Sequence, residues 1–108
     1  MNANIVELTS RNFTNEVRNT DQIVLIDFWA TWCMPCRMVS PTIDSLAEQY
    51  KGRVKVCKVN IDKEPELANQ FGILSIPTVV AVKNGAVIDK LVGAMPKQHY
   101  TGMLGKYI

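Results

Sequence analysis

Two cysteines three positions apart are the residues of this chain best suited to chemistry. They lie in the segment Trp32-Cys33-Met34-Pro35-Cys36, just before a predicted helix. Residues three apart at a helix start share a face, so the two sulfurs can form a reversible disulfide. The unpaired N–H groups and the dipole of a helix N-terminus also stabilise a thiolate. We therefore expect Cys33 to face solvent and attack, and Cys36 to lie beneath the turn and resolve.

An acidic residue within an apolar run is the second candidate. Asp27 interrupts residues 23–29 (IVLIDFW), which predict a strand covered on both faces. Burial disfavours the ionised carboxyl group, so the pKa of Asp27 should rise. Its strand leads directly to Cys33, and we expect Asp27 to be the general base for the Cys36 thiol. Lys58 shares the side-chain parity of the valines in its own predicted strand and is a possible neighbour of Asp27.

Other interpretations of these residues stay open at this point. A pair of cysteines can be half of a zinc site, but Cys57 and His99 are separated and lack metal-ligand spacing. Asp27 can be a structural buried acid, and Lys58 can be a surface lysine with its stem on apolar side chains. Cys57 is predicted to be a small core residue, and His99 a solvated helix residue.

Length, composition and charge exclude several classes of protein. The 108 residues suit one domain spanning 1–108, and 47% hydrophobic with 20% charged residues is typical of globular chains. A net charge of +2 does not provide the concentrated basic surface that nucleic acid requires. No apolar run approaches the roughly 20 residues of a membrane span. Residues 1–9 lack the features of a secretory signal, so we expect a cytoplasmic protein, in which a close cysteine pair is more often catalytic or metal-binding than structural.

The hydrophobic pattern predicts strands that alternate with helices. Expected strands are 5–8, 23–29, 54–61, 77–83 and 86–92; expected helices follow Thr9 or Ser10, span 34–50, follow Asp62 as an N-cap, and open at Pro96. Asn84-Gly85 is typical of a two-residue hairpin between the last two strands. Crossover helices impose parallel pairing on the other strands. We therefore expect an α/β fold, with a mixed central sheet of about five strands flanked by four helices.

The longest predicted helix, 34–50, carries a stripe of apolar residues at helical spacing. The residues of this stripe are Met38, Ile43, Leu46, Ala47 and Tyr50.

The motifs together closely resemble the thioredoxin family. The matching segments are VLIDFWATWC (24–33), Pro35-Cys36, Pro41, KVNID (58–62), FGILSIPT (71–78), KNG (83–85) and VGA (92–94). They cover nearly the whole chain, in order and without large insertions. The resemblance implies the thioredoxin fold and a protein-disulfide reductase that works by thiol–disulfide exchange.

The resemblance also implies a role for each matching position. Cys33 corresponds to the nucleophile, Cys36 to the resolving cysteine, Asp27 to the buried acid and Lys58 to the lysine beside it. Pro77 corresponds to a cis-proline whose loop packs against the active-site disulfide. The backbone before this proline would pair with an extended substrate segment. The docking surface would be flat and mostly apolar: Trp32, Met34, Pro35, Ile76, Pro77, Gly93 and Ala94.

One position departs from the family pattern, because Met34 stands where the family usually has glycine. Its side chain would either enlarge the apolar docking surface or restrict access to the cysteines. The proline before Cys36 favours a reductant, since oxidants and isomerases commonly carry histidine there. A disulfide oxidant or isomerase and a non-catalytic binding subunit remain the alternatives.

The resemblance extends to partners and cofactors. We expect disulfide-containing protein substrates and a thioredoxin reductase as the electron source. No bound cofactor, nucleic acid, metal or membrane is expected, and the chain should be a monomer.

Overall fold

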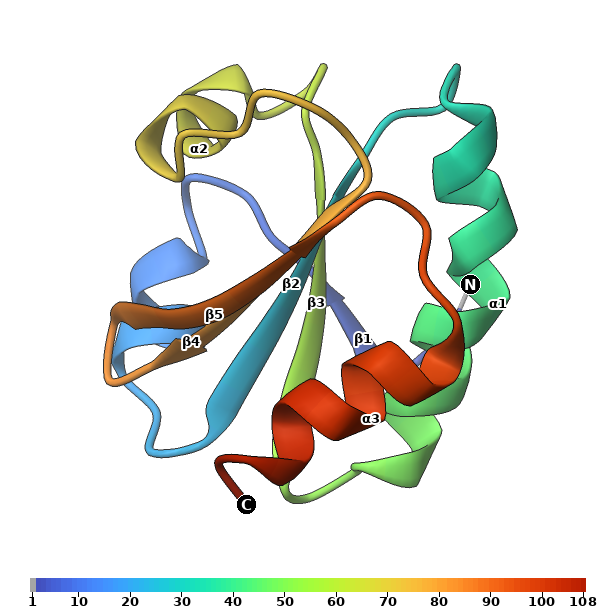
Figure 1. The fold of residues 1–108 in the computed structure, drawn as a ribbon. Helices are drawn as coiled ribbons and strands as arrows, with labels where there is room; N and C mark the ends of the chain where they lie inside the picture. Colours follow the sequence, from blue (N-terminus) through green and yellow to red (C-terminus); the bar gives the residue numbers. More distant parts are fainter. Residues whose placement is uncertain (1) are drawn as a thin grey trace.

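The computed structural model describes residues 2–108 and contains a mixed sheet of five strands (Figure 1). Its elements are β1 (Ile5–Glu7), η1 (Thr14–Arg18), β2 (Ile23–Trp29), α1 (Met34–Gln49), β3 (Val54–Asn60), α2 (Pro65–Gln70), β4 (Thr78–Lys83), β5 (Ala86–Val92) and α3 (Lys97–Gly105). The order of strands and helices is the one predicted. The prediction that the chain starts without a secretory signal includes Met1, which lies outside the described residues.

The sheet has the strand order β1-β3-β2-β4-β5. β3 pairs in parallel with both β1 and β2, whereas β4 pairs antiparallel with β2 and β5. β2 is therefore a central strand with partners on both edges. Its first six residues are buried, because helices also cover both of its faces. This double burial explains the nearly continuous apolar run, and the carboxyl end of β2 delivers the chain to the cysteine pair.

Helices α1 and α3 cover one face of the sheet, and η1 and α2 lie on the other (Figure 1). The first core includes Leu25, Ile43, Leu46, Val56 and Tyr100. The second core includes Phe13, Val17, Phe28, Cys57 and Leu67. Because side chains alternate along a strand, neighbours on β2 enter different cores. Asp27 has the parity of Leu25, which places it on the side of α1 and α3.

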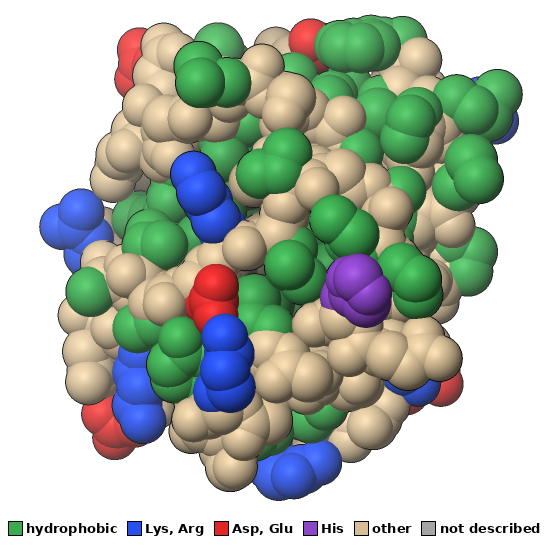
Figure 2. Space-filling view, viewed as in Figure 1, with side chains coloured by type: hydrophobic (Ala, Val, Ile, Leu, Met, Phe, Trp, Pro, Cys, Tyr) green, Lys and Arg blue, Asp and Glu red, His purple; other side chains and the backbone are tan. Residues whose placement is uncertain are grey.

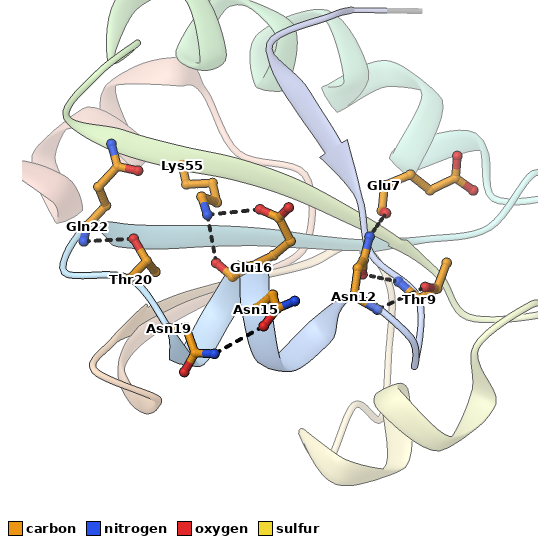
Figure 3. A network of polar contacts seen from close by, with 9 residues as sticks. All are labelled: Glu7, Thr9, Asn12, Asn15, Glu16, Asn19, Thr20, Gln22 and Lys55. Carbon is orange, nitrogen blue, oxygen red and sulfur yellow. Dashed lines mark hydrogen bonds and ion pairs between the residues drawn. The ribbon is translucent and has the colours of Figure 1, made fainter.

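Polar contacts hold η1 against the sheet (Figure 3). The Thr9 hydroxyl accepts from the Asn12 N–H at 3.4 Å, and the Asn12 side chain donates to the Glu7 carbonyl at 2.9 Å. Lys55 Nζ donates to both the carbonyl and the carboxylate of Glu16, at 3.0 and 2.9 Å. η1 is a π-helix whose N-cap is Phe13, without a side-chain hydrogen bond, so neither Thr9 nor Ser10 caps it as expected. Thr9 orders the turn before η1 instead.

The turn between β4 and β5 is the predicted hairpin. Asn84 and Gly85 have φ values of 51° and 79°. A type I′ turn requires positive φ at both central residues, which glycine and asparagine adopt at low cost. The two strands leave this turn in antiparallel register.

Two further predictions about helix residues are wrong. Met38 is not part of the buried stripe, because 71% of its surface is exposed. The stripe runs instead through Cys36, Val39 and Ile43, which recur at intervals of three and four residues and face the sheet.

Asp62 does not cap α2, whose N-cap is Glu64 and makes no side-chain hydrogen bond. The Asn60 side chain accepts from the N–H groups of Asp62 and Lys63, at 3.0 and 3.3 Å, and so orders this connection. The carboxylate of Asp62 is consequently available to a partner elsewhere in the chain.

Candidate active site

Cys33 and Cys36 form a disulfide at the beginning of α1. Their Cα atoms are 5.3 Å apart, within the usual range for a disulfide. Cys33 is the N-cap residue, with extended backbone, and its Sγ accepts a hydrogen bond from the Cys36 N–H at 3.2 Å. Pro35 lies in the first turn, where a missing N–H has no cost. The helix start therefore both brings the sulfurs together and directs a donor at Cys33.

The expected difference in exposure between the two cysteines is not present in the disulfide form. Cys33 is 4% exposed and Cys36 is 2% exposed, so the prediction that Cys33 faces solvent is wrong for this form. The cause is the segment before Pro77, which packs over the pair. Cys33 Sγ lies 3.9 Å from the Ile76 carbonyl oxygen. A reacting partner must therefore approach Cys33 along the edge of this segment.

The Ile76–Pro77 peptide bond is cis, as the resemblance implied. Gly93 has a φ of 91°, and its N–H donates to the Pro77 carbonyl at 2.8 Å, which ties the loop after β5 to the loop before β4. Within residues 2–108, the Ile76 N–H has no hydrogen-bond partner. An unpaired backbone group beside Cys33 is thus available to another chain.

Exposed apolar side chains surround the cysteine pair. Trp32 is 68% exposed, and Met34 and Pro35 next to it are also exposed. Figure 2 shows hydrophobic side chains gathered at the end of the molecule where α1 begins. Of the other predicted docking residues, Ala94 is exposed, Ile76 and Gly93 are half-buried and Pro77 is buried. The structure therefore brings these residues together around the disulfide.

Sequence reasoning missed Leu74, which is 99% exposed. Leu74 and Trp32 line a surface hollow of about 310 Å³, together with Ile61 and Ile76. A large apolar residue two positions before Ile76 was the available signal. The Leu74 side chain extends the apolar surface from the cysteine pair toward α2.

The Trp32 ring is held by Asp62. Trp32 Nε1 donates to Asp62 Oδ2 at 2.9 Å. This contact joins the start of α1 to the connection after β3. It explains why Asp62, rejected as a helix cap, still contributes to the site: it fixes the orientation of an exposed indole.

Asp27 is buried on β2 beneath this site. In residues 2–108, its Oδ1 atom is buried and has no hydrogen-bond partner. Burial raises the pKa of Asp27 to about 7, and the positive charge of Lys58 partly opposes this rise. A carboxyl group with this pKa can gain or lose a proton near neutral pH.

Lys58 faces Asp27 in the parallel register of β2 and β3. Its ammonium group does not form an ion pair with Asp27 within the described chain. It donates instead to Ser40 Oγ at 3.0 Å and lies 5.9 Å from the centre of a Trp29 ring. Sequence reasoning missed Ser40, although its position four residues after Cys36 on α1 placed both on one helix face.

The remaining candidates lie away from the site. Cys57 is a fully buried free thiol in the core on the other face of the sheet, and burial raises its pKa to about 12. This confirms Cys57 as a core residue. His99 is exposed on α3, as predicted.

Among residues 2–108, no group of three His, Cys, Asp or Glu is placed to hold a metal ion. Nor is any helix in that range long and apolar enough to cross a membrane.

A disulfide between cysteines three residues apart at the start of a helix, beside a cis-proline loop, is the site of a thiol–disulfide oxidoreductase. Residues 4–106 match the thioredoxin family, and the chain belongs to this family. Thioredoxin 1 of Nostoc sp. is 48% identical over 102 residues, which cover 94% of this chain and 95% of that protein. Thioredoxin of Porphyra purpurea is 47% identical over 104 residues, covering 96% and 97% of the two chains. Thioredoxin 2 of Chlorobaculum tepidum is 44% identical over 108 residues, covering 100% and 99%.

These similarities and the cysteine pair define the activity. The chain has protein-disulfide oxidoreductase activity and works by thiol–disulfide exchange. Its family indicates disulfide-containing substrates and a reductase that restores the dithiol. A non-catalytic binding subunit and a dedicated oxidant or isomerase are not favoured.

Proposed function

We propose that this chain is a protein-disulfide reductase in which Cys33 attacks and Cys36 resolves. The observation that carries the proposal is the Cys33–Cys36 disulfide at the start of α1, with the Cys36 N–H directed at Cys33 Sγ. A donor at this sulfur stabilises its thiolate after reduction. Cys36 is buried on the face of α1 that packs on the sheet, which suits the second step.

The reaction starts when the Cys33 thiolate attacks one sulfur of a substrate disulfide. A mixed disulfide forms, and the other substrate sulfur leaves as a thiolate. Cys36 then loses its proton to the Asp27 carboxylate and attacks Cys33 Sγ. The mixed disulfide breaks, and the second substrate sulfur leaves. Two electrons have passed to the substrate, and the protein carries its own disulfide.

Asp27 suits the role of proton acceptor because of its position and its environment. It is buried on the face of the sheet that α1 covers, and its pKa is raised to about 7. Its unpartnered Oδ1 has no competing donor among residues 2–108. Lys58, opposite in register, then serves as a modulator that favours the carboxylate.

The substrate is proposed to dock as an extended segment across the apolar surface. Trp32, Met34 and Pro35 supply one side of this surface. Ile76, Pro77, Gly93 and Ala94 supply the other, and the free Ile76 N–H supports strand-like pairing. Such pairing positions a substrate sulfur at the edge of the segment that covers Cys33.

We also propose that the protein works in the cytoplasm, as a monomer without a bound cofactor, and receives electrons from a thioredoxin reductase. The free Cys57 thiol suits a reducing compartment. Thiol exchange needs only the two sulfurs and a proton acceptor, all of which the chain supplies.

The test compares Cys33→Ser and Cys36→Ser in the reduction of a protein disulfide. Cys33→Ser should abolish turnover, because no nucleophile remains. Cys36→Ser should accumulate a mixed disulfide through Cys33, detectable by its mass and released by a small thiol. Cys57→Ala, which leaves the active pair intact, is the matched control and should turn over normally. Full activity of Cys33→Ser, or no trapped adduct with Cys36→Ser, would contradict the assignment.

A further inference from the structure

The charged group that faces Asp27 from β3 is held by a side chain of α1. Lys58 Nζ donates to Ser40 Oγ at 3.0 Å. Asp27 and Lys58 are register partners, and adjacent strands lie about 4.8 Å apart. The ammonium group is thus near the carboxyl group, although no ion pair joins them within residues 2–108. The Ser40 hydroxyl is its hydrogen-bond acceptor.

From this geometry, we propose that Ser40 is a positioning residue that holds the Lys58 ammonium group within electrostatic reach of Asp27. The proposal rests on the proposed role of Asp27 as acceptor of the Cys36 proton. Ser40 does not touch the reacting sulfurs in this account. It acts through Lys58 and determines how readily Asp27 accepts that proton.

The surface beside Ser40 offers the Lys58 ammonium group an alternative position. Ser40 and Lys58 line a hollow of about 760 Å³, which Asp44 and Glu48 also line. Ser40, Asp44 and Glu48 recur every four residues along α1, so they share one face of the helix. The carboxylates of Asp44 and Glu48 lie in later turns of α1, progressively farther from its start. A lysine side chain without its serine acceptor can extend into this hollow, toward negative charge and away from Asp27.

A serine is suited to this task because its hydroxyl is an uncharged acceptor. A hydrogen bond from an ammonium group is stronger than one between neutral groups, and it fixes the end of a flexible side chain. A carboxylate at the same position would neutralise the charge that Asp27 experiences. The hydroxyl holds the charge in place and leaves it intact.

The other titratable groups around Asp27 do not replace Lys58. Cys36 on α1 is the proton donor in the proposed reaction. Tyr100 on α3 is buried, and its hydroxyl accepts from the Met95 N–H at 3.3 Å. Asp44 and Glu48 are the remaining charged groups on the lining of the hollow. Lys58 is therefore the positive charge that favours ionised Asp27.

The direction of the effect follows from Coulomb's law. A positive charge near Asp27 stabilises its carboxylate and lowers its pKa, as Lys58 does here. In Ser40→Ala, the ammonium group moves farther from Asp27, so the pKa of Asp27 should rise. The pH at which the resolving step reaches half its maximal rate should then increase by about half a pH unit.

The experiment measures the resolving step alone across neutral pH. Mixed disulfides between the protein and a small aromatic thiol are formed, and release of the thiol is followed by its absorbance in single turnovers. The variants are Ser40→Ala, Ser40→Thr and Asp27→Asn. Ser45→Ala is the matched control, because Ser45 Oγ also accepts from a lysine, Lys97, at 2.8 Å on the same helix.

Titration of the Asp27 carboxyl group, followed by NMR in the folded oxidised protein, is the second readout. It detects a displaced ammonium group without depending on turnover. Ser40→Ala should raise both midpoints, Ser40→Thr should restore them, and Ser45→Ala should leave them unchanged.

Three outcomes would overturn the proposal. Unchanged midpoints in Ser40→Ala, with pH dependence lost in Asp27→Asn, would remove Ser40 and leave the proposed function intact. An equal shift in Ser45→Ala would assign the effect to the helix surface in general. A pH profile of Asp27→Asn identical to that of the unmodified protein would reject Asp27 as the acceptor, and the role of Ser40 would fall with it.

Discussion

Asp27 and Lys58 face each other across β2 and β3, yet the Lys58 ammonium group is hydrogen-bonded to Ser40 and not to the Asp27 carboxyl group. This arrangement leaves Asp27 with a favourable charge nearby but without a direct partner among residues 2–108. The pKa of Asp27 consequently stays high, at about 7. The raised pKa that suits Asp27 to catalysis at neutral pH therefore also lowers the stability of the folded chain at that pH.

Asp27→Asn should remove a loss of stability that the unmodified protein shows as the pH rises. The pKa of Asp27 is raised to about 7 in the folded chain, mainly by burial, against about 3.9 in an unfolded chain. Between these values the unfolded chain releases the proton first, so the free energy of unfolding falls, and above about 7 it stays low. The full difference corresponds to about 4 kcal/mol at most.

Urea denaturation at a series of pH values checks this prediction. The difference in the free energy of unfolding between Asp27→Asn and the unmodified protein should change through this interval and level off on either side. A difference that does not depend on pH would contradict it. Asp21→Asn, at an exposed acid before β2, is the control.

Lys58→Met should raise the pKa of Asp27 further. The methionine keeps much of the apolar stem and removes the positive charge that opposes the burial effect. The pH at which the resolving step is half-maximal should shift upward, and by more than in Ser40→Ala. The same single-turnover assay measures it. A shift toward lower pH would show that Lys58 does not favour ionised Asp27.

Met34→Gly should weaken the docking of protein substrates while leaving the chemistry of small disulfides nearly unchanged. Met34 is exposed beside Cys33, and loss of its apolar area should raise KM by a few-fold, about 1 kcal/mol. Kinetics with one protein disulfide and one small disulfide check this. Met38→Gly, one turn later and also exposed, controls for the effect of glycine in the helix. Equal loss with both substrates would point to a change at the cysteines.

Asp62→Ala should free the Trp32 ring. The carboxylate accepts from Trp32 Nε1 at 2.9 Å, and because the indole is exposed, the effect on stability should stay below about 1 kcal/mol. KM for a protein disulfide should rise by a few-fold, since a mobile ring loses more freedom on binding. Tryptophan fluorescence and steady-state kinetics check both effects. A normal KM together with altered fluorescence would separate Trp32 orientation from docking.

Cys57 should be inert in the folded protein. It is the one cysteine outside the Cys33–Cys36 disulfide, it is fully buried, and its pKa is raised to about 12. The oxidised protein should therefore not react with a charged alkylating reagent at neutral pH, and should take up one equivalent after denaturation. Mass spectrometry counts the adducts. Rapid labelling of the folded chain would contradict the predicted inertness.

The amino-acid sequence by itself determined the order of the elements and the position of the reactive pair. The apolar run around Asp27 indicated a strand buried on both faces, and Asn84-Gly85 indicated the hairpin. The spacing of Cys33 and Cys36 indicated a disulfide. These features depend on periodicity along a few residues, because helix and strand geometry place near neighbours on known faces.

Only the tertiary structure decided which distant groups meet at the site. Asp62 holds Trp32 from 30 residues away, Ile76 covers Cys33 from 43 residues away, and Ser40 holds Lys58 across 18 residues. The exposure expected for Cys33, the helix cap expected at Asp62 and the burial expected for Met38 failed for the same reason. Each depends on how the loops and helices sit against the sheet, and local periodicity carries no information about that placement.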